Sequence, residues 1–181
     1  RMVNYIGTNK IVEAAILRRV KRIVFSSSAA VYGASEEILL SESDRTAPCS
    51  PYGQSKLEAE ELLRLQSKYV DAVSLRYFNV YGPGQVLPRG YGAVIPSFIT
   101  KARLRQRPII FEDGMQMRDF CHVRDVAAAN IAAAKFEYPF YGTVYNIASG
   151  EAITILELWN IIAELSGCSK LSPHYRPSRP G

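Results

Sequence analysis

The chain has 181 residues, of which 48% are hydrophobic and 22% are charged, and its formal net charge is +5. This composition is ordinary for a globular protein of a length that buries a sizeable core, so it excludes a disordered chain, a collagen and a small disulfide-stabilised protein. No apolar run approaches the roughly 18 to 20 residues that a membrane helix needs, so we expect no membrane partner.

The first part of the chain predicts two helices, each followed by a strand. Apolar residues at helical spacing indicate a helix over 3–19, and the run Arg-Ile-Val-Phe indicates a short buried strand over 21–26. The polar segment 33–51, which ends in proline, is typical of a loop. An amphipathic helix over 56–69 and a strand over 72–77 are expected to follow.

The densest group of positive charges is Arg18-Arg19-Val20-Lys21-Arg22, where the first predicted helix ends and the first strand begins. Cations suit the negative end of a helix dipole, and no aromatic residue interrupts the run to stack on bases. We therefore expect a structural role for this cluster and no nucleic-acid partner.

The second part of the chain continues the alternation of helices and strands. Residues 80–92 hold four glycines and two prolines, a composition typical of an irregular connection that carries function. Strands that alternate with helices favour βαβ units and an α/β fold with a mostly parallel sheet. The expected elements are a helix over 95–105, a strand over 108–111, an extended segment over 119–123, a helix capped by Asp125 that runs to about Phe136, a strand over 144–148, and a helix that opens with a Thr154–Glu157 capping box and ends at Gly167.

Three cysteines, Cys49, Cys121 and Cys168, are too few and too scattered for a disulfide framework or a zinc site. We expect reduced thiols in a cytoplasmic protein. The two histidines, His122 and His174, have no metal-ligand spacing, so no metal site is predicted.

The candidate catalytic residues are Tyr52, Lys56 and Ser28. Tyr52 and Lys56 are an i, i+4 pair on one helical face, where the ammonium can favour the phenolate and make it a usable general base. Taken alone, this spacing also fits a half-buried tyrosine beside a lysine that extends to solvent. The run Ser26-Ser27-Ser28 ends a strand, and open parallel sheets bind ligands at that edge. A hydroxyl, a base and a cation together suit proton removal from an alcohol coupled to hydride transfer.

Six motifs follow one another along the whole chain: Asn4-Tyr-Ile-Gly-Thr8 with Glu13-Ala-Ala, Phe25-Ser-Ser-Ser-Ala-Ala-Val-Tyr-Gly33, Ser50-Pro-Tyr-Gly-Gln-Ser-Lys56, Arg76-Tyr-Phe-Asn-Val-Tyr-Gly-Pro83, Arg118-Asp-Phe-Cys-His-Val123 and Tyr145-Asn-Ile-Ala-Ser-Gly150. With them the chain resembles the extended short-chain dehydrogenase/reductases and, within these, the NAD-dependent nucleotide-sugar epimerases similar to UDP-glucose 4-epimerase. The resemblance implies part of a Rossmann-type doubly wound parallel sheet with a smaller α/β substrate-binding region. Residues 1–80 would be the second half of the NAD-binding domain, and 81–181 mostly the substrate-binding region, with 119–148 returning to the sheet.

The resemblance also implies roles for the matching residues. Tyr52 would be the catalytic base, Lys56 would hold the nicotinamide ribose and favour the phenolate, and Ser28 would bond the sugar hydroxyl that is oxidised. Asn4 and Phe78 match positions near the NAD cofactor. Asn4 could instead satisfy backbone groups between a helix and a strand.

A larger set of positions would bind the nucleotide-sugar. Asn79, Arg118 and Arg179 match positions at the diphosphate, where a guanidinium fork suits paired phosphate oxygens. Apolar walls and backbone would hold the base, although these residues could equally belong to the core, and Arg118 could pair with a nearby aspartate. The implied substrate-binding set is Ser28, Tyr52, Asn79, Val94, Ile109, Ile110, Phe111, Arg118 and Arg179.

One departure from the family pattern concerns completeness. The glycine-rich turn and the acidic residue that reads the adenosine ribose are absent from this sequence, so we expect the first four strands or so, and a C-terminal segment, to lie outside it.

The reaction type is indicated by Ala29 and Ala30, because sugar-nucleotide dehydratases of the family place an acidic residue shortly after the hydroxyl that Ser28 matches. The resemblance therefore implies an isomerase of carbohydrate metabolism: a homodimeric epimerase that oxidises C4 of a UDP-hexose to a 4-keto sugar, interconverts UDP-glucose and UDP-galactose, and pairs through the helix bearing Tyr52. The alternatives are another nucleotide-sugar epimerase or reductase of this family, or a non-catalytic remnant that binds a nucleotide or a partner.

Overall fold

The computed structural model describes residues 2–34, 39–85 and 93–177, and the chain divides into two compact units. The first unit comprises Arg1–Val80 and Cys121–Gly150, and the second comprises Tyr81–Phe120 and Glu151–Gly181. The first unit is therefore built from two stretches of chain that are separated in sequence by a stretch of the second.

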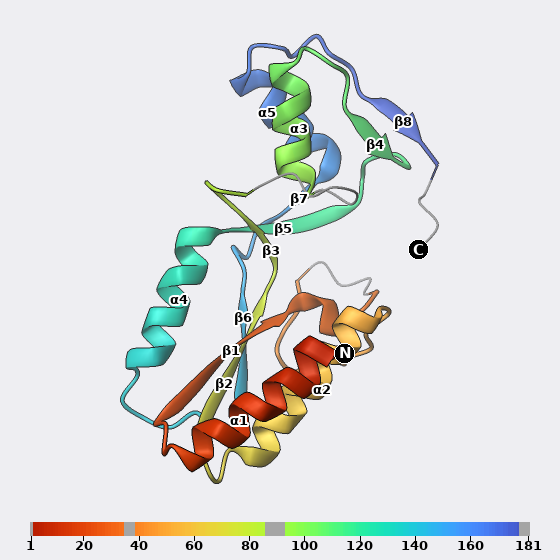
Figure 1. Ribbon diagram of the computed structural model, residues 1–181. Helices are drawn as coiled ribbons and strands as arrows, with labels where there is room; N and C mark the ends of the chain where they lie inside the picture. The colour runs from red at the N-terminus through yellow and green to blue at the C-terminus, as the bar shows by residue number, and fades with distance from the viewer. Residues whose placement is uncertain (1, 35–38, 86–92, 178–181) are drawn as a thin grey trace. The chain divides into compact units, whose positions relative to one another are not determined.

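A three-stranded parallel sheet forms the centre of the first unit, in the order β1 (Arg22–Ser28), β2 (Asp71–Tyr77) and β6 (Thr143–Ile147). Two helices, α1 (Thr8–Leu17) and α2 (Pro51–Gln66), run side by side along one face (Figure 1). The apolar core under them includes Val12, Leu63 and Ala72.

The opposite face of this sheet is covered by α4 (Val123–Lys135) (Figure 1). Val73 and Leu75 point to this side and pack with Ala133, whereas Ala72 packs beneath α1 and α2. Such alternation follows from the two-residue period of a strand, and it places the polar residues Ser74 and Arg76 on the same face as Ala72. A parallel sheet with helices on both faces confirms the expected α/β fold.

Two short segments complete the first unit. A π-helical segment, Met2–Gly7, leads into α1, and a 3₁₀ turn, Ala29–Val31, follows β1. The predicted helix over 3–19 is thus an α-helix only from Thr8.

The second unit packs α3 (Val94–Arg103) and α5 (Ile155–Leu165) around a core in which Phe98 and Trp159 meet edge to face, with ring centroids 5.6 Å apart. The remaining described strands are short. β5 (Met117–His122) lies between β3 (Asn79–Tyr81) and β7 (Ala152–Thr154), and β4 (Ile109–Phe111) pairs in parallel with β8 (His174–Arg176). Of these strands, β3 and β5 each belong partly to the first unit. The strands β3, β7 and β8 were not predicted, because they lack the continuous apolar run that indicated β4, which is equally short.

The helix ends follow local capping chemistry. The predicted capping box is confirmed: Thr154 Oγ1 accepts from the Glu157 amide at 3.0 Å, and the Glu157 carboxylate accepts from the Thr154 amide at 2.8 Å. Gly167, at φ +60°, ends that helix as expected. The prediction that Asp125 caps α4 is wrong, because His122 does so through Nδ1, which accepts from the Arg124 amide at 3.2 Å.

No helix within the described ranges has the length and apolar character required to cross a membrane.

An ion pair joins the first residues of β1 and β2. Arg22 Nε donates to Asp71 Oδ2 at 2.6 Å, and its Nη1 also donates to the carbonyls of Ala133 and Phe136 near the end of α4, at 2.9 and 2.5 Å. Asp71 Oδ1 accepts in turn from the amide of Phe140 at 2.7 Å. The pair therefore ties two strands to the chain that leads into β6.

Asp71 should make the stability of this unit depend on pH in acid. Burial disfavours its charged form, but hydrogen bonds from Arg22 and from two backbone amides outweigh this and lower the pKa of Asp71 below its ordinary value. A carboxylate whose pKa is depressed in the folded state contributes stability above its unfolded pKa of about 4 and loses it as the pH falls further. Urea unfolding between pH 6 and pH 3 should show this loss, and Asp71→Asn should flatten the dependence. An equally steep dependence in that variant would contradict the assignment.

Candidate functional site

Three consecutive serines end β1, and each makes a different contact. The Ser26 carbonyl accepts from Lys56 Nζ at 2.8 Å, and the Ser27 hydroxyl donates to the Glu60 carboxylate. Ser28 Oγ accepts from the Ala30 amide at 3.2 Å and so caps the 3₁₀ turn that follows. The carboxyl end of β1 is therefore fixed by α2 and by its own turn.

Helix α2 begins five residues before its predicted start, at Pro51. Ser50 Oγ accepts from the Gly53 amide at 3.1 Å, and proline suits the first helical position because no amide is needed there. Tyr52 consequently lies in the first turn. Its side chain is 50% exposed, so the hydroxyl-bearing ring is accessible to a ligand.

Gly53 explains how closely the start of α2 approaches the turn after β1. A Cβ added at this position would lie 2.4 Å from the carbonyl oxygen of Ala30, far inside contact distance. The absence of a side chain thus lets the turn of helix that carries Tyr52 lie against the turn that follows Ser28.

Lys56 lies between the aromatic rings of Tyr52 and Phe25. Its ammonium nitrogen is 5.7 Å from the centroid of the Tyr52 ring and 5.0 Å from that of Phe25, within the range of cation–π attraction. Partial burial lowers the pKa of Lys56 below its ordinary value. The structure therefore brings the predicted base and the predicted cation together.

Beneath this site lies a buried ion pair between Glu60 of α2 and Arg76 of β2, each 4% exposed. Arg76 Nη2 donates to Glu60 Oε2 at 2.7 Å and Nε donates to Oε1 at 3.0 Å, a two-point contact between fork and carboxylate. Burial alone would lower the pKa of Arg76, but hydrogen bonds to Glu60 and Tyr32 raise it above its ordinary value.

The pair continues toward β6 through two further residues. Arg76 Nη1 donates to the Tyr32 hydroxyl at 2.9 Å, and that hydroxyl donates to Asn146 Oδ1 at 2.6 Å. Asn146 also binds the loop before α2, since its Nδ2 donates to the Leu40 carbonyl at 2.8 Å. One connected set of hydrogen bonds thus spans α2 and all three strands of the sheet.

We predicted no role for this network from the sequence, although its residues lie in or beside the six family motifs. The available signals were an arginine within the mostly apolar predicted strand 72–77 and a glutamate one helical turn beyond Lys56. A charged residue predicted to be buried implies a buried partner, but the sequence does not show which one.

The predicted cofactor residues Asn4 and Phe78 also lie in the first unit. Asn4 Nδ2 donates to Ser55 Oγ at 3.1 Å, and Ser55 Oγ donates to the Tyr52 carbonyl at 2.8 Å, so Asn4 braces the first turn of α2. Phe78 is half-buried, and its amide donates to the Ile147 carbonyl at 3.1 Å. Asn79, predicted to bind the diphosphate, is exposed at the first residue of β3.

The remaining predicted substrate residues lie in the second unit. Val94 is the first residue of α3 and packs against the apolar core of the second unit. Arg118 is exposed on β5, and its Nη1 donates to the Met117 carbonyl at 2.7 Å. Ile110 is 1% exposed and forms part of that core, so only its backbone can serve a ligand. Ile109 and Phe111 flank it in β4 and are half-buried, and Arg179 lies outside the described residues.

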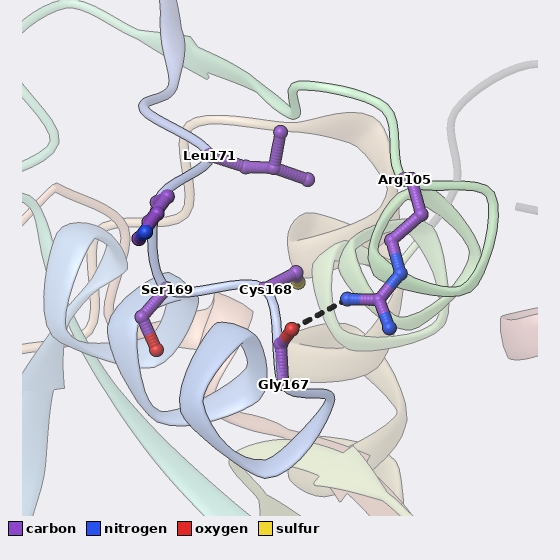
Figure 2. Close-up of a pocket in the computed structure, with 6 residues that line it drawn as sticks. Arg105, Gly167, Cys168, Ser169 and Leu171 are labelled. Atoms are coloured by element: carbon purple, nitrogen blue, oxygen red, sulfur yellow. Dashed lines mark hydrogen bonds between the residues drawn. The ribbon is translucent and has the colours of Figure 1, made fainter.

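A pocket of about 390 Å³ in the second unit is separate from all of these predicted residues (Figure 2). It lies after α5 and is lined by Arg105, Cys168, Ser169, Lys170 and Leu171, with Arg105 Nη1 donating to the Gly167 carbonyl at 2.6 Å. Across the described residues, no group of three or more histidine, cysteine or acidic side chains could hold a metal ion.

Comparison with known proteins supports the resemblance seen in the motifs. A sequence model of the NAD dependent epimerase/dehydratase family matches residues 2–148. A putative UDP-glucose 4-epimerase of Methanocaldococcus jannaschii is 40% identical over 163 residues, which cover 88% of this chain and 52% of that protein. The chain spans about half the length of the curated relatives it matches.

Solved structures agree with the sequence relatives. The UDP-N-acetylglucosamine 4-epimerase of Methanobrevibacter ruminantium M1, in complex with UDP-N-acetylmuramic acid, superposes with a TM-score of 0.93 at 39% identity, over 99% of this chain and 57% of that one. The UDP-glucose 4-epimerase of Thermotoga maritima with UDP-glucose gives 0.90 at 33% identity, over 99% and 58%. The expected resemblance and the expected Rossmann-type fold are confirmed.

Gly53→Ala should separate the two turns that carry Tyr52 and Ser28. Alanine favours a helix interior by about 1 kcal/mol relative to glycine, but the overlap with the Ala30 carbonyl should outweigh this and cost about 1–3 kcal/mol net. Denaturant unfolding measures this cost. Gln54→Ala, the neighbouring and exposed position, is the control and should change stability by less than about 0.5 kcal/mol. An unchanged or increased stability of Gly53→Ala would show that the close approach is not needed.

Proposed function

Because the chain belongs to the NAD dependent epimerase/dehydratase family, we propose that it carries the catalytic centre of an NAD-dependent nucleotide-sugar epimerase acting at C4 of a UDP-hexose. The observation that carries the proposal is the pairing of Lys56 with Tyr52 in the first turns of α2, beside the carboxyl end of β1. Open parallel sheets bind ligands at this edge. The absence of an acidic residue at Ala29 and Ala30 favours an epimerase over a dehydratase.

In the proposed reaction Tyr52 acts as general base toward the sugar hydroxyl at C4, and returns the proton when the sugar is reduced again. Lys56, whose ammonium nitrogen is 5.7 Å from the centroid of the Tyr52 ring, would hold the nicotinamide ribose beside the base. Ser28 would hydrogen-bond the same sugar hydroxyl and so orient it toward the base. The roles of these three residues rest on their match to the family motifs and on their placement at one sheet edge.

The donors at this edge fit the nicotinamide ribose of NAD, since the Lys56 ammonium and the half-exposed Tyr52 hydroxyl can both bond ribose hydroxyls. NAD, when bound, would supply the hydride acceptor and donor. Asn4 would then act indirectly, by bracing α2 through Ser55, and Phe78 would lie near the cofactor.

The proposed roles in binding the nucleotide-sugar rest on the match of each residue to the family motifs. Asn79, Arg118 and Arg179 are each proposed to bind the diphosphate, and Asn79 and Arg118 are exposed polar groups suited to it. The half-buried residues Val94, Ile109 and Phe111, with the backbone of Ile110, would hold the base. In this proposal residues 1–80, together with much of 119–148, belong to the NAD-binding domain, and most of 81–181 binds substrate.

A homodimer and a cytoplasmic location are part of the same proposal. Dimerisation through the helical face of α1 and α2 is supported by the large apolar side chains that these helices leave exposed, among them Ile11, Leu17 and Leu65. Sedimentation at micromolar concentration tests it, and a monomer there would count against it.

The second candidate function is a non-catalytic remnant that binds a nucleotide or a partner. Calorimetric titration of the 181-residue chain with NAD and with UDP separates the candidates. Clear NAD binding by this chain alone would argue against the remnant.

Tyr52→Phe tests the catalytic proposal directly. In a full-length homologue that carries these residues, here called the complete protein, turnover of UDP-glucose to UDP-galactose should fall by about 10²- to 10⁴-fold, the usual contribution of a general base. The melting temperature should stay unchanged, because the ring remains and the side chain is half exposed. Undiminished turnover would overturn the mechanism. A panel of UDP-, dTDP- and GDP-sugars assayed on the unsubstituted protein would identify another epimerase or a reductase.

A further inference from the structure

The end of β1 presents successive residues to successive turns of α2. The Ser26 carbonyl accepts from Lys56, and the Ser27 hydroxyl donates to Glu60, which lies one helical turn further on. Ser28, proposed to orient the sugar hydroxyl, comes next in the chain. The two residues before Ser28 therefore both contact α2, and these contacts fix where Ser28 lies relative to that helix.

Glu60 receives donors from two adjacent strands. Ser27 and Arg76 are register partners in β1 and β2, so their side chains leave the same face of the sheet side by side. Oε1 accepts from both the Ser27 hydroxyl and Arg76 Nε, while Oε2 accepts from Arg76 Nη2. A buried carboxylate held at three points has little freedom to move, and α2 moves with it.

We propose that Glu60 is a positioning residue which, through the Ser27 hydroxyl, holds Lys56 and Ser28 in register with Tyr52. This inference rests on the proposed function for the roles of those three residues. Glu60 touches neither substrate nor cofactor in this scheme. Arg76 fixes where the carboxylate lies, and Ser27 transmits that position to the end of β1.

The two contacts of Glu60 separate positioning from simple stabilisation. The ion pair with Arg76 holds the helix on the sheet, and removing either charge would leave the other buried without compensation. The Ser27 contact adds a link at the site itself. Replacing Ser27 removes that link and leaves the ion pair in place, so Ser27→Ala is the informative variant.

Ser74 provides a matched control. It lies on β2 two residues before Arg76 and hence on the same face of the sheet, it is 1% exposed, and within the described part of the chain its Oγ has no hydrogen-bond partner. Ser27→Ala and Ser74→Ala therefore each remove one buried hydroxyl from one sheet face, but only the first breaks a contact to Glu60.

The experiment compares the complete protein with these two variants by steady-state kinetics. Ser27→Ala should lower kcat by about 10- to 100-fold, the effect of a small misplacement of catalytic groups, and change KM less than about twofold. Ser74→Ala should change neither constant. Equal effects of the two variants, or an effect of Ser27→Ala on KM alone, would overturn the proposal.

A second readout does not depend on turnover. The Cε–Hε NMR signal of Lys56, identified by its disappearance in Lys56→Arg, should shift in Ser27→Ala and stay in place in Ser74→Ala. If the complete protein epimerises no sugar, the proposed function fails while this comparison still tests the positioning. An unmoved Lys56 signal in Ser27→Ala overturns the positioning whether or not the protein is active.

Discussion

A buried carboxylate–guanidinium pair is the contact on which the candidate site depends. Glu60 and Arg76 join α2 to the middle strand of the sheet, and every residue proposed for proton transfer lies on this helix or at the end of the neighbouring strand. The attraction between two buried charges offsets the free-energy cost of their desolvation only when the geometry is good and the remaining polar atoms are hydrogen-bonded. The hydroxyls of Ser27 and Tyr32 meet that condition here.

The same pair explains how the position of α2 on β2 can be fixed closely in a fold held mainly by apolar contacts. Apolar packing between α2 and the sheet, as at Leu63 and Ala72, tolerates small shifts because it is not directional. A guanidinium that is bonded at two points to a carboxylate tolerates such shifts much less. Gly53 adds a steric limit in the first turn of α2, which meets the Ala30 carbonyl. Lys56 lies between these two constraints along α2, and Tyr52 comes directly before Gly53.

Features with a local cause could be predicted from the sequence. The Tyr52–Lys56 proximity follows from helical spacing, and the Thr154–Glu157 capping box from four adjacent residues. The partners of Glu60 and Asn4 could not be predicted, because such contacts depend on how distant elements pack. The start of α2 and the His122 cap were missed for another reason: serine before proline and histidine before a helix are weaker signals than the apolar period that follows them.

The discontinuity of the first unit has a consequence for the order in which it can form. During synthesis β1 and β2 emerge before β6, and some 40 residues of the second unit, 81–120, lie between them in the chain. Until α4 and the segment before β6 arrive, β2 presents an unpaired edge, and Arg22 lacks the carbonyls of Ala133 and Phe136 that it binds in the folded state. The Arg22–Asp71 pair thus offers the late segment both donors, on Arg22, and an acceptor, on Asp71. A nascent chain that stalls in this interval exposes an apolar strand able to pair with another copy.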